Sequence, residues 1–366
     1  FREDSRNIMH DRHDRAATSR HHLALSGLLL LLLAPPAHAL RVATWNLLAY
    51  DDAAVPVRRP YMLQVLPGLD PDVMVVQELL TAAAADSFGN LLRATMPGKL
   101  WVGGNATYIP AAESALYYDA NKISASAVIG ITTGGPRPVL QVLLRPNGYL
   151  ANAASFRLYS IHFKAGDGGG GFSPPSDSAT RTLECTNLRK NWLNTVPSGT
   201  NLLMGGDTNF YGSFETGYTR LTESQADNDG RLKDNLSMPG LWNNAAYAPY
   251  HTQSPCLAGC IGSTGGMDDR FDMLLGSYLM NDGAGLDLVS GGLPNGYGPY
   301  GNDGLHYNQS IDAGGFNNAV GVAVAGALRL SSDHLPVVAT LQLPAKLATA
   351  SALSFGDVLV GATAAQ

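Results

Sequence analysis

The 366-residue chain has only three cysteines and no run of lysine or arginine residues. Three cysteines are too few for a domain held together chiefly by disulfides. Without a basic run, and with a formal net charge of −6, the chain is not expected to track a nucleic-acid backbone by electrostatics. The acidic balance does not exclude phosphate chemistry, because a bound divalent cation inverts the local charge. Hydrophobic residues make up 45% of the chain, which predicts a globular fold with a large core.

The most hydrophobic stretch, Leu23–Ala34, has 12 residues and is too short to span a bilayer. Three arginines precede it between residues 12 and 20, and Ala37–Ala39 places small residues before a cleavage point at Leu40. This order predicts a signal peptide and N-terminal extension over residues 1–39, rather than a buried core helix. The mature chain is then expected to have no transmembrane segment and to be secreted, periplasmic or on the surface of a bacterial cell.

Cys256 and Cys260 bracket a Leu-Ala-Gly loop sequence. In an exported chain this spacing favours a local disulfide. A zinc site is the weaker interpretation, because there is no second cysteine pair and no nearby pair of histidines. Cys185 lies in an amphipathic run and is predicted to be a small buried residue.

Apolar runs alternate with helical patterns after Leu40, which predicts an α/β protein. The predicted strands are Leu40–Leu48, Asp72–Glu78, Leu100–Ile109, Ser114–Tyr118, Lys122–Ile131, Val139–Arg145, Phe156–Phe163, Leu202–Gly206, Asp269–Gly276 and Leu335–Leu343. The predicted helices are Arg58–Leu69, Ala82–Met96 and Ser178–Leu193. Strands follow one another directly between Leu100 and Phe163. That succession favours two packed mixed sheets with outer helices over one doubly wound sheet.

Two glycine-rich segments, Lys164–Asp177 and Gly283–Gly315, are predicted to be loops. The catalytic or binding domain is expected to cover residues 40–346. Residues 347–366 do not continue the core pattern. They are predicted to be a linker and the truncated start of an immunoglobulin-like module.

Polar residues of a few types stand at the ends of six apolar runs. They are Asn46, Glu78, His162, Asp207 with Asn209, Asp272, and Asp333 with His334. Any one of them alone would be read as a cap or turn residue. Together they indicate a site, because strand ends on one rim of a sheet converge in space.

The residue types fit a hard cation beside a phosphate group. Mg²⁺ takes oxygen ligands, and Glu78 offers a carboxylate while Asn46 offers an amide oxygen. Asp207 is placed to orient or deprotonate a water, and Asn209 to hold that water or a phosphate oxygen. An imidazole beside an acid, as at His334, makes a base or a phosphate contact.

Six motifs, "TWNLL", "VVQEL", "YSIHFKAG", "MGGDTNFY", "RFDMLL" and "SSDHLPV", occur in one order across Thr44–Val337. In that order they resemble the endonuclease/exonuclease/phosphatase superfamily, which has the deoxyribonuclease-I-like fold. "HTQS" and "GMDDRFD" resemble a secreted bacterial branch of it. The resemblance implies a four-layer α/β/β/α sandwich and metal-dependent cleavage of phosphoester bonds.

The resemblance also implies where the cation binds. Asn46 and Glu78 match the metal-side residues of the first two motifs, and Asp333 matches the metal-side acid of the last. The expected cofactor is Mg²⁺, with Mn²⁺ or Ca²⁺ as alternatives.

The remaining motif residues carry implied catalytic roles. His162 resembles the general acid or phosphate-binding histidine, and Asp207 and Asn209 resemble the pair that positions the attacking water. Asp272 resembles an acid that supports a histidine or a metal, and His334 resembles the residue at the scissile phosphate. The family leaves open whether Asp207 or His334 is the base.

Four further residues are weaker candidates. Lys164, Arg181 and His251 are predicted to contact substrate, with solvated surface groups as an equal interpretation for the first two. Glu113 lies near the position of a second family acid, in an uncertain register.

The sequence therefore predicts a secreted, metal-dependent phosphoesterase, with an extracellular nuclease acting on DNA or RNA as the leading hypothesis. A sphingomyelinase-like enzyme acting on phospholipid, or an inositol-phosphate phosphatase, is the alternative within the same fold. A non-catalytic surface binding module is the alternative of a different class. The substrate and the oligomeric state stay open at this point.

Overall fold

The computed structural model describes residues 39–150, 152–166 and 176–344. The predicted signal peptide and C-terminal module therefore lie outside the described residues, as does most of the predicted loop Lys164–Asp177. Within the described ranges, no helix has the length and apolar character needed to cross a membrane. The α-helices are α1 (Ala54–Leu69), α2 (Ala82–Thr95), α3 (Asp177–Asn191), α4 (Thr216–Thr222) and α5 (Val322–Ser331).

The strands form two seven-stranded sheets. The first has the order β12-β14-β1-β2-β4-β3, with β13 also paired to β14, and the second has the order β10-β11-β9-β8-β7-β5, with β6 also paired to β7. The first contains β1 (Ala39–Tyr50), β2 (Val73–Leu79), β3 (Trp101–Ile109), β4 (Ser114–Asp119), β12 (Asp287–Leu288), β13 (Tyr297–Pro299) and β14 (Val337–Gln342). The second contains β5 (Ile123–Ala125), β6 (Ile129–Ile131), β7 (Val139–Pro146), β8 (Phe156–His162), β9 (Asn201–Asp207), β10 (Leu232–Lys233) and β11 (Asp272–Ser277).

Each sheet has one parallel pair at its centre, β1–β2 in the first and β8–β9 in the second, among antiparallel neighbours. The carboxyl ends of these four strands therefore lie at one rim of their sheets. The antiparallel partners β14 and β11 begin at that same rim, since Thr44 pairs with Val337 and Asp207 pairs with Asp272. This pairing collects strand ends from all six elements at one place.

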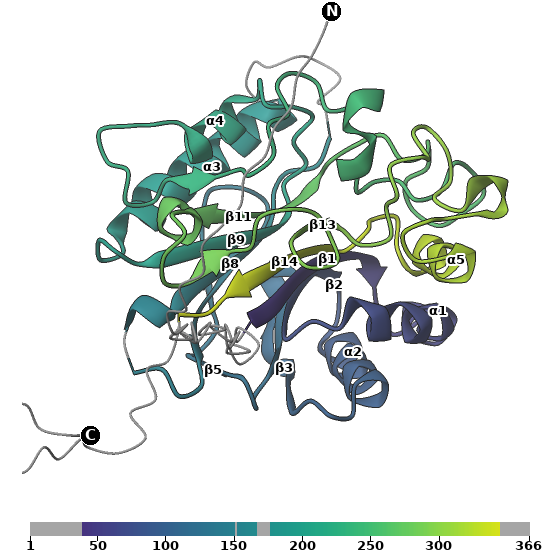
Figure 1. The fold of residues 1–366 in the computed structure, drawn as a ribbon, viewed down its shortest axis with the longest axis horizontal. Helices are drawn as coiled ribbons and strands as arrows, with labels where there is room; N and C mark the ends of the chain where they lie inside the picture. Colours follow the sequence, from purple (N-terminus) through teal and green to yellow (C-terminus); the bar gives the residue numbers. More distant parts are fainter. Residues whose placement is uncertain (1–38, 151, 167–175, 345–366) are drawn as a thin grey trace, which may run out of the picture. The chain divides into compact units, whose positions relative to one another are not determined.

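The layers follow from the two-residue alternation of the strands. In β1, Leu40 and Val42 pack into a core between the sheets, whereas Ala43 and Trp45 pack into a core beneath α1, α2 and α5. In β9, Leu203 packs into the same core between the sheets. Leu202 points the other way and packs into a third core with residues of α3 and α4. Figure 1 shows these helices on opposite outer sides of the two sheets. The predicted α/β/β/α sandwich is confirmed.

The interface between the sheets becomes small and polar towards the rim. Gln77 of β2 donates a hydrogen bond across the interface to Ser160 of β8, with a nitrogen–oxygen distance of 2.9 Å. A Cβ on Gly205 of β9 would lie 2.4 Å from Leu274 of the neighbouring β11 and 3.6 Å from the Cβ of Thr44 in the first sheet. These residues let the two sheets approach closely where the strands end.

Two predictions about the chain's path need correction. Gly283–Gly315 is not simply a surface loop, because it contributes β12 and β13 to the first sheet and buries Leu286 and Ile311. Strands of two and three residues are too short to produce an alternating pattern. The run Lys122–Ile131 is divided into β5 and β6, which pair with different parts of β7.

Arg181, predicted to contact substrate, lies in a buried ion pair within the protein. Its guanidinium is 1% exposed and binds both oxygens of Glu215, at 2.8 and 3.0 Å. It also donates to the backbone oxygens of Lys164 and Gly166. A basic residue on a helix looks like a solvated group in the sequence, because its buried acid partner is 34 residues away.

His251, also predicted to contact substrate, lies in the interior of the protein. Its ring is fully buried, and its two nitrogens lie 2.8 Å from the backbone oxygen of Trp242 and 3.2 Å from that of Met267. The imidazole therefore joins two loop segments of the protein rather than facing a ligand.

Replacing Arg181 with methionine tests its structural role. The change leaves the buried Glu215 carboxylate without its partner, so the free energy of unfolding should fall by about 3–5 kcal/mol. Urea denaturation followed by circular dichroism measures this loss. Arg220→Met is the matched control, because Arg220 and Glu223 form an ion pair in which both side chains are over 40% exposed. The control should lose no more than about 1 kcal/mol, and equal losses in both variants would contradict the assignment.

Candidate active site

A bulge in β1 shapes the first part of the site. The β1–β2 register is interrupted between Asn46 and Tyr50, and Leu48 and Ala49 adopt left-handed backbone conformations. The N–H of Leu48 donates to Oδ1 of Asn46 at 2.9 Å, and the N–H of Ala49 donates to Oε2 of Glu78 at 2.7 Å. Bulges of this kind re-aim side chains and are frequent beside active sites.

Glu78 departs from the alternation of its strand. Its φ is 59°, a left-handed conformation that costs a non-glycine residue roughly 1–3 kcal/mol. In β2, Val75 and Gln77 face the other sheet, so a regular strand would direct Glu78 to the helix side. The positive φ instead turns the carboxylate towards Asn46, whose Nδ2 donates to Oε1 of Glu78 at 2.9 Å.

Asn46 also reaches across to the second sheet. The same Nδ2 donates to Oδ2 of Asp207 at 3.0 Å, so one amide group joins the carboxylates of both sheets. Asn46 thus lies with Glu78 as predicted. It is the nitrogen of its amide that faces the carboxylates, and its oxygen accepts from the bulge.

His162 completes this cluster from the end of β8. Its Nε2 lies 3.5 Å from Oδ2 of Asp207 and 3.9 Å from Oε1 of Glu78. Its Nδ1 is buried and has no hydrogen-bond partner among the described residues.

The carboxylate of Glu113, the other acid considered from the sequence, is ion-paired with Arg137 at 2.9 Å.

Asn209 is fixed by the turn that follows β9. Its φ is 52°, a left-handed conformation that asparagine tolerates better than most residues. Its N–H donates to Oδ1 of Asp207 at 3.0 Å, and its Nδ2 donates to the backbone oxygen of Phe163 at 3.2 Å. This turn holds one carboxylate oxygen of Asp207 and leaves the other to face Asn46 and the histidines.

His334 and Asp272 form the second half of the site. Nδ1 of His334 lies 2.7 Å from Oδ2 of Asp272, and its Nε2 lies 3.7 Å from Oδ2 of Asp207. Nε2 is also 2.6 Å from the side-chain nitrogen of Gln253. Nδ1 donates to Asp272, and Nε2 faces the side-chain amide of Gln253.

Asp333 is held by the segment that follows the disulfide. Cys256 and Cys260, the predicted pair, form this disulfide. Three residues after Cys260, the N–H of Ser263 donates to Oδ2 of Asp333 at 2.7 Å. Oδ1 of Asp333 is buried without a hydrogen-bond partner among the described residues, and it lies 4.0 Å from Nε2 of His334.

The two histidines have opposite protonation preferences. Burial lowers the pKa of His162 to about 4, although Asp207 acts in the other direction. Burial would also lower the pKa of His334, but Asp272 and Asp207 together outweigh it and hold that pKa well above its usual range. Burial raises the pKa of Asp207 against the attraction of both rings. Near neutral pH the site therefore combines a neutral and a charged imidazole.

The acids of the site exceed its bases. Glu78, Asp207, Asp272 and Asp333 meet here, and none forms an ion pair with Lys or Arg within the described part of the chain. Oδ1 of Asp272 and Oδ1 of Asp333 are both buried and unpartnered there. An oxygen of Asp207, an oxygen of Asp272 and a ring nitrogen of His334 lie within 4.8 Å of one another, a spacing that suits a metal ion. A divalent cation fits this donor set, since oxygen-rich sites favour hard cations.

Lys164 does not join the cluster through any contact that the structure shows. Its ammonium is ion-paired with Asp177 at 2.8 Å, and its side chain is 39% exposed. Gln253 and Ser263, by contrast, contact the catalytic-site candidates but were missed from the sequence. Neither has a local pattern that marks it, because their partners His334 and Asp333 lie 81 and 70 residues away.

No family model and no curated protein matches the chain. Solved structures do match. A zebrafish (D. rerio) TDP2 humanized by 14 mutations aligns with a TM-score of 0.50 and 14% identity, over 83% of this chain and 98% of that one. The catalytic domain of human Nocturnin aligns with a TM-score of 0.50 and 17% identity, over 83% of this chain and 94% of that one. The chain thus shares its fold with these two structures, and that fold is the α/β/β/α sandwich that the motifs predicted.

The contact between His334 and Asp272 can be tested in metal-free protein. Asp272→Asn removes the carboxylate that raises the pKa of His334, so this imidazole should release its proton at a lower pH than in the wild type. NMR titration of the histidine ring protons in the presence of EDTA measures the shift. Asp229→Asn, an exposed change on the loop before β10, is the control and should leave the titration unchanged. An identical His334 titration in Asp272→Asn would refute the pairing.

Proposed function

We propose that the protein is a divalent-metal-dependent phosphoesterase. The observation that carries this proposal is the rim cluster, in which four carboxylates surround two oppositely tuned histidines and, within the described part of the chain, pair with no lysine or arginine. A buried excess of negative charge is unfavourable by itself. It becomes favourable when a cation and a phosphate group occupy the site together, because the cation compensates both.

The residues that would hold the cation are Glu78 and the acids whose oxygens are unpartnered, Asp272 and Asp333. Asp207 and His334 lie beside these acids at the centre, where their polar atoms and those of Asp272 are within 4.8 Å of one another. Asn46 orients Glu78 and Asp207 through its amide nitrogen. When bound, the cation supplies charge stabilisation for the phosphoryl oxygens.

Asp207 is best suited to be the base. Its raised pKa brings it closer to neutral pH than an ordinary carboxylate, which favours proton abstraction from water. The hydrogen bond from Asn209 fixes one of its oxygens and so orients the other. The water oxygen then attacks phosphorus while its proton passes to Asp207, and the ester oxygen leaves.

The histidines take different parts in this reaction. His334 is held charged by Asp272, so it stabilises the negative charge that develops on the phosphoryl oxygens. His162 is neutral near pH 7, so its ring binds a phosphate oxygen through an N–H without adding charge. The wide difference between their pKa values separates the two roles.

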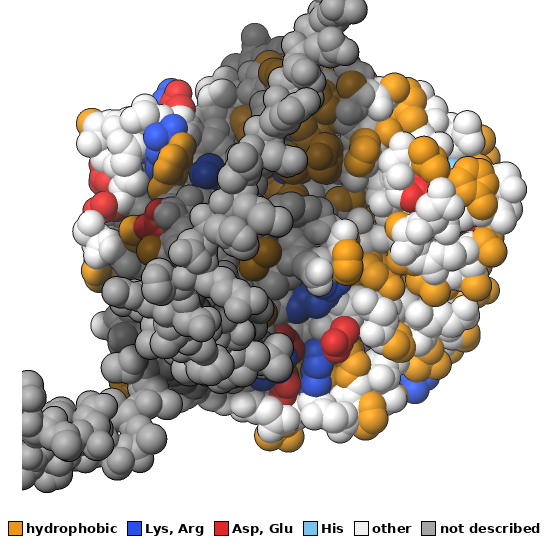
Figure 2. All heavy atoms as spheres, in the orientation of Figure 1, with side chains coloured by type: hydrophobic (Ala, Val, Ile, Leu, Met, Phe, Trp, Pro, Cys, Tyr) orange, Lys and Arg blue, Asp and Glu red, His pale blue; other side chains and the backbone are white. Residues whose placement is uncertain are grey.

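The substrate that we propose first is a nucleic acid, cut outside the cell by a secreted enzyme. Support comes from the motif order and from the predicted signal peptide. On the face drawn in Figure 2, the visible Lys and Arg side chains lie singly or beside acidic ones rather than in a continuous track. Binding should therefore depend on the cation more than on protein charge.

A phospholipid substrate has a specific observation in its favour. Leu257, inside the disulfide loop, and Ile261, directly after it, are 49% and 46% accessible, and Ser263 of the same segment contacts Asp333. Apolar side chains beside a catalytic rim would suit a lipid surface. Release of phosphocholine from sphingomyelin vesicles, set against nicking of plasmid DNA, separates the two substrates.

The nuclease assignment predicts cleavage of plasmid DNA or RNA by residues 40–346 in Mg²⁺, Mn²⁺ or Ca²⁺, and none in EDTA. Gel electrophoresis detects the products. The nuclease assignment fails if neither nucleic acid is cut under any metal condition. Cleavage that persists in EDTA would instead contradict the metal requirement.

Asp207→Asn should lower kcat by about 10²–10⁴-fold, because the general base is lost. Thermal unfolding should show that the variant still folds, and Asp229→Asn should keep wild-type turnover. Unchanged turnover in Asp207→Asn would remove this residue from the mechanism.

Glu78→Gln should raise the metal concentration needed for half-maximal activity, because a charged oxygen ligand becomes neutral. Activity measured across a Mg²⁺ titration tests this expectation. Glu113→Gln is the matched control, since that acid is paired with Arg137 rather than with the site. Superimposable titrations for Glu78→Gln and the wild type would exclude Glu78 as a ligand.

A further inference from the structure

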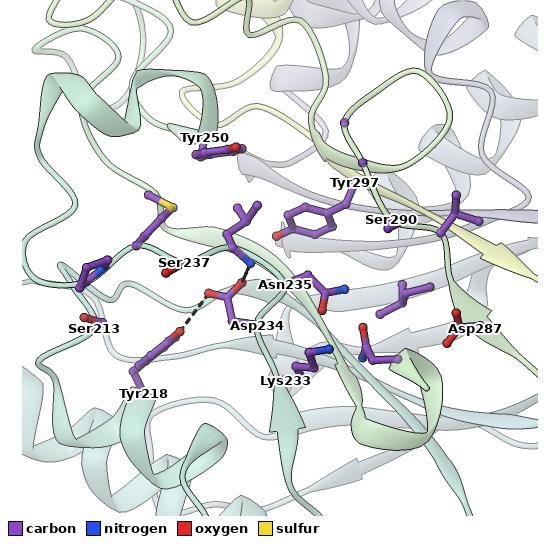
Figure 3. Close-up of a pocket in the computed structure, with 18 of the residues that line it drawn as sticks. Ser213, Tyr218, Lys233, Asp234, Asn235, Ser237, Tyr250, Asp287, Ser290 and Tyr297 are labelled. Atoms are coloured by element: carbon purple, nitrogen blue, oxygen red, sulfur yellow. Dashed lines mark hydrogen bonds between the residues drawn. The ribbon is translucent and has the colours of Figure 1, made fainter. Parts of the chain in front are cut away.

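A second cavity lies away from the catalytic rim. It has a volume of about 970 Å³ and is bordered by residues 233–239 after β10 and by residues 287–292 at β12 and beyond. Tyr218 of α4, Tyr250 and Tyr297 of β13 supply its aromatic surface. Figure 3 shows the side chains that converge on the cavity.

The strands themselves separate this cavity from the active site. β11 begins at Asp272 in the site, and its far end pairs with β10, where Lys233 lines the cavity. β14 likewise follows His334 and ends at Gln342, another lining residue. At about 3.3 Å per residue, the length of β11 places these ends roughly 17 Å apart.

The floor of the cavity is a satisfied structural network. Arg270 is buried and binds both oxygens of Asp234, at 2.7 and 2.9 Å. Tyr218 donates to Asp234 at 3.0 Å, and Trp242 lies under the guanidinium at 5.1 Å. Figure 3 shows this carboxylate at the centre of the view. These charges neutralise each other and give the cavity a rigid base.

The walls differ from the floor, because several of their polar side chains have no hydrogen-bond or ion-pair partner in the part of the chain that the structure describes. The side chains of Lys233, Asn235, Ser237, Tyr250 and Ser290 line the cavity without a hydrogen bond or ion pair to any described residue. They offer amide and hydroxyl groups that both donate and accept. They are spread along both walls rather than gathered at one point.

This chemistry selects among ligand classes. Arg270 neutralises Asp234, and the remaining charged lining residues are Lys233 and Asp287. The cavity therefore has no excess of positive charge, which disfavours phosphates and other anions. The amides and hydroxyls disfavour a purely apolar ligand, which would leave them unpaired. Tyrosine faces with interspersed neutral donors and acceptors suit a polyhydroxylated ligand, whose C–H faces pack on rings while its hydroxyls bond to the walls. The volume is large enough for more than one sugar ring.

We propose that this cavity binds a neutral oligosaccharide, as a site distinct from the catalytic rim. The protein would then hold a glycan at one end of its sheets and keep the rim at the other end free for its phosphoester substrate. Because the site uses none of the rim residues, the inference does not rest on the proposed catalytic function.

Isothermal titration calorimetry with maltohexaose, cellohexaose, xylohexaose and chitohexaose tests the site in the full domain. At least one should bind the wild type, and Tyr250→Ala and Asn235→Ala should each weaken that binding about tenfold or more, because each removes a wall contact. Asn235 is exposed, so its replacement should leave the fold intact.

Asn121→Ala is the matched control, an exposed asparagine in the turn between β4 and β5 with no side-chain contact among the described residues, and it should bind as the wild type does. Hydrolysis of bis-p-nitrophenyl phosphate should be equal in all four proteins, including a result of no hydrolysis. Absence of binding to all four oligosaccharides would overturn the proposal. Equal binding by the wild type, Tyr250→Ala and Asn235→Ala would overturn it as well.

Discussion

The close approach of the two sheets at one rim is the constraint on which the site depends. Nδ2 of Asn46 can reach Oδ2 of Asp207 only because the residues behind them are small or hydrogen-bonded across the interface. Deeper in the molecule, the same interface is filled by large aliphatic side chains. The sandwich is thus a hydrophobic core that becomes a polar cleft where its strands end.

Much of this arrangement is encoded in the two-residue alternation of the strands. Val42 of β1 packs between the sheets, and Asn46, four residues later, points to the same side of the strand. Leu203 of β9 also packs between the sheets, and Asp207, four residues later, points to the same side of that strand. His162 and Asp272 obey the same rule with Leu158 and Leu274. Residue types at strand ends, read together with parity, therefore place most of the site from the sequence alone.

What escapes prediction depends on contacts between distant segments or on departures from regular backbone. The motif predicted Glu78 for the site, but strand alternation alone would direct its side chain to the helix side, and the positive φ that turns it has no local sequence signal. Gln253 approaches His334 through an isolated bridge between loops. The burial of Arg181 could not be predicted either, because its partner Glu215 lies at the start of a different helix, α4. Local patterns carry no information about such partners.

The bulge in β1 has a consequence for how the site tolerates change. It holds Asn46 and Glu78 through the N–H groups of Leu48 and Ala49, and every residue except proline provides that group. The identities of these two side chains are therefore nearly free to drift, provided that each accepts a left-handed backbone. A one-residue insertion or deletion is different, because it would shift the register of β1 against β2 and withdraw both donors together. This part of the site is robust to substitution and fragile to changes in chain length.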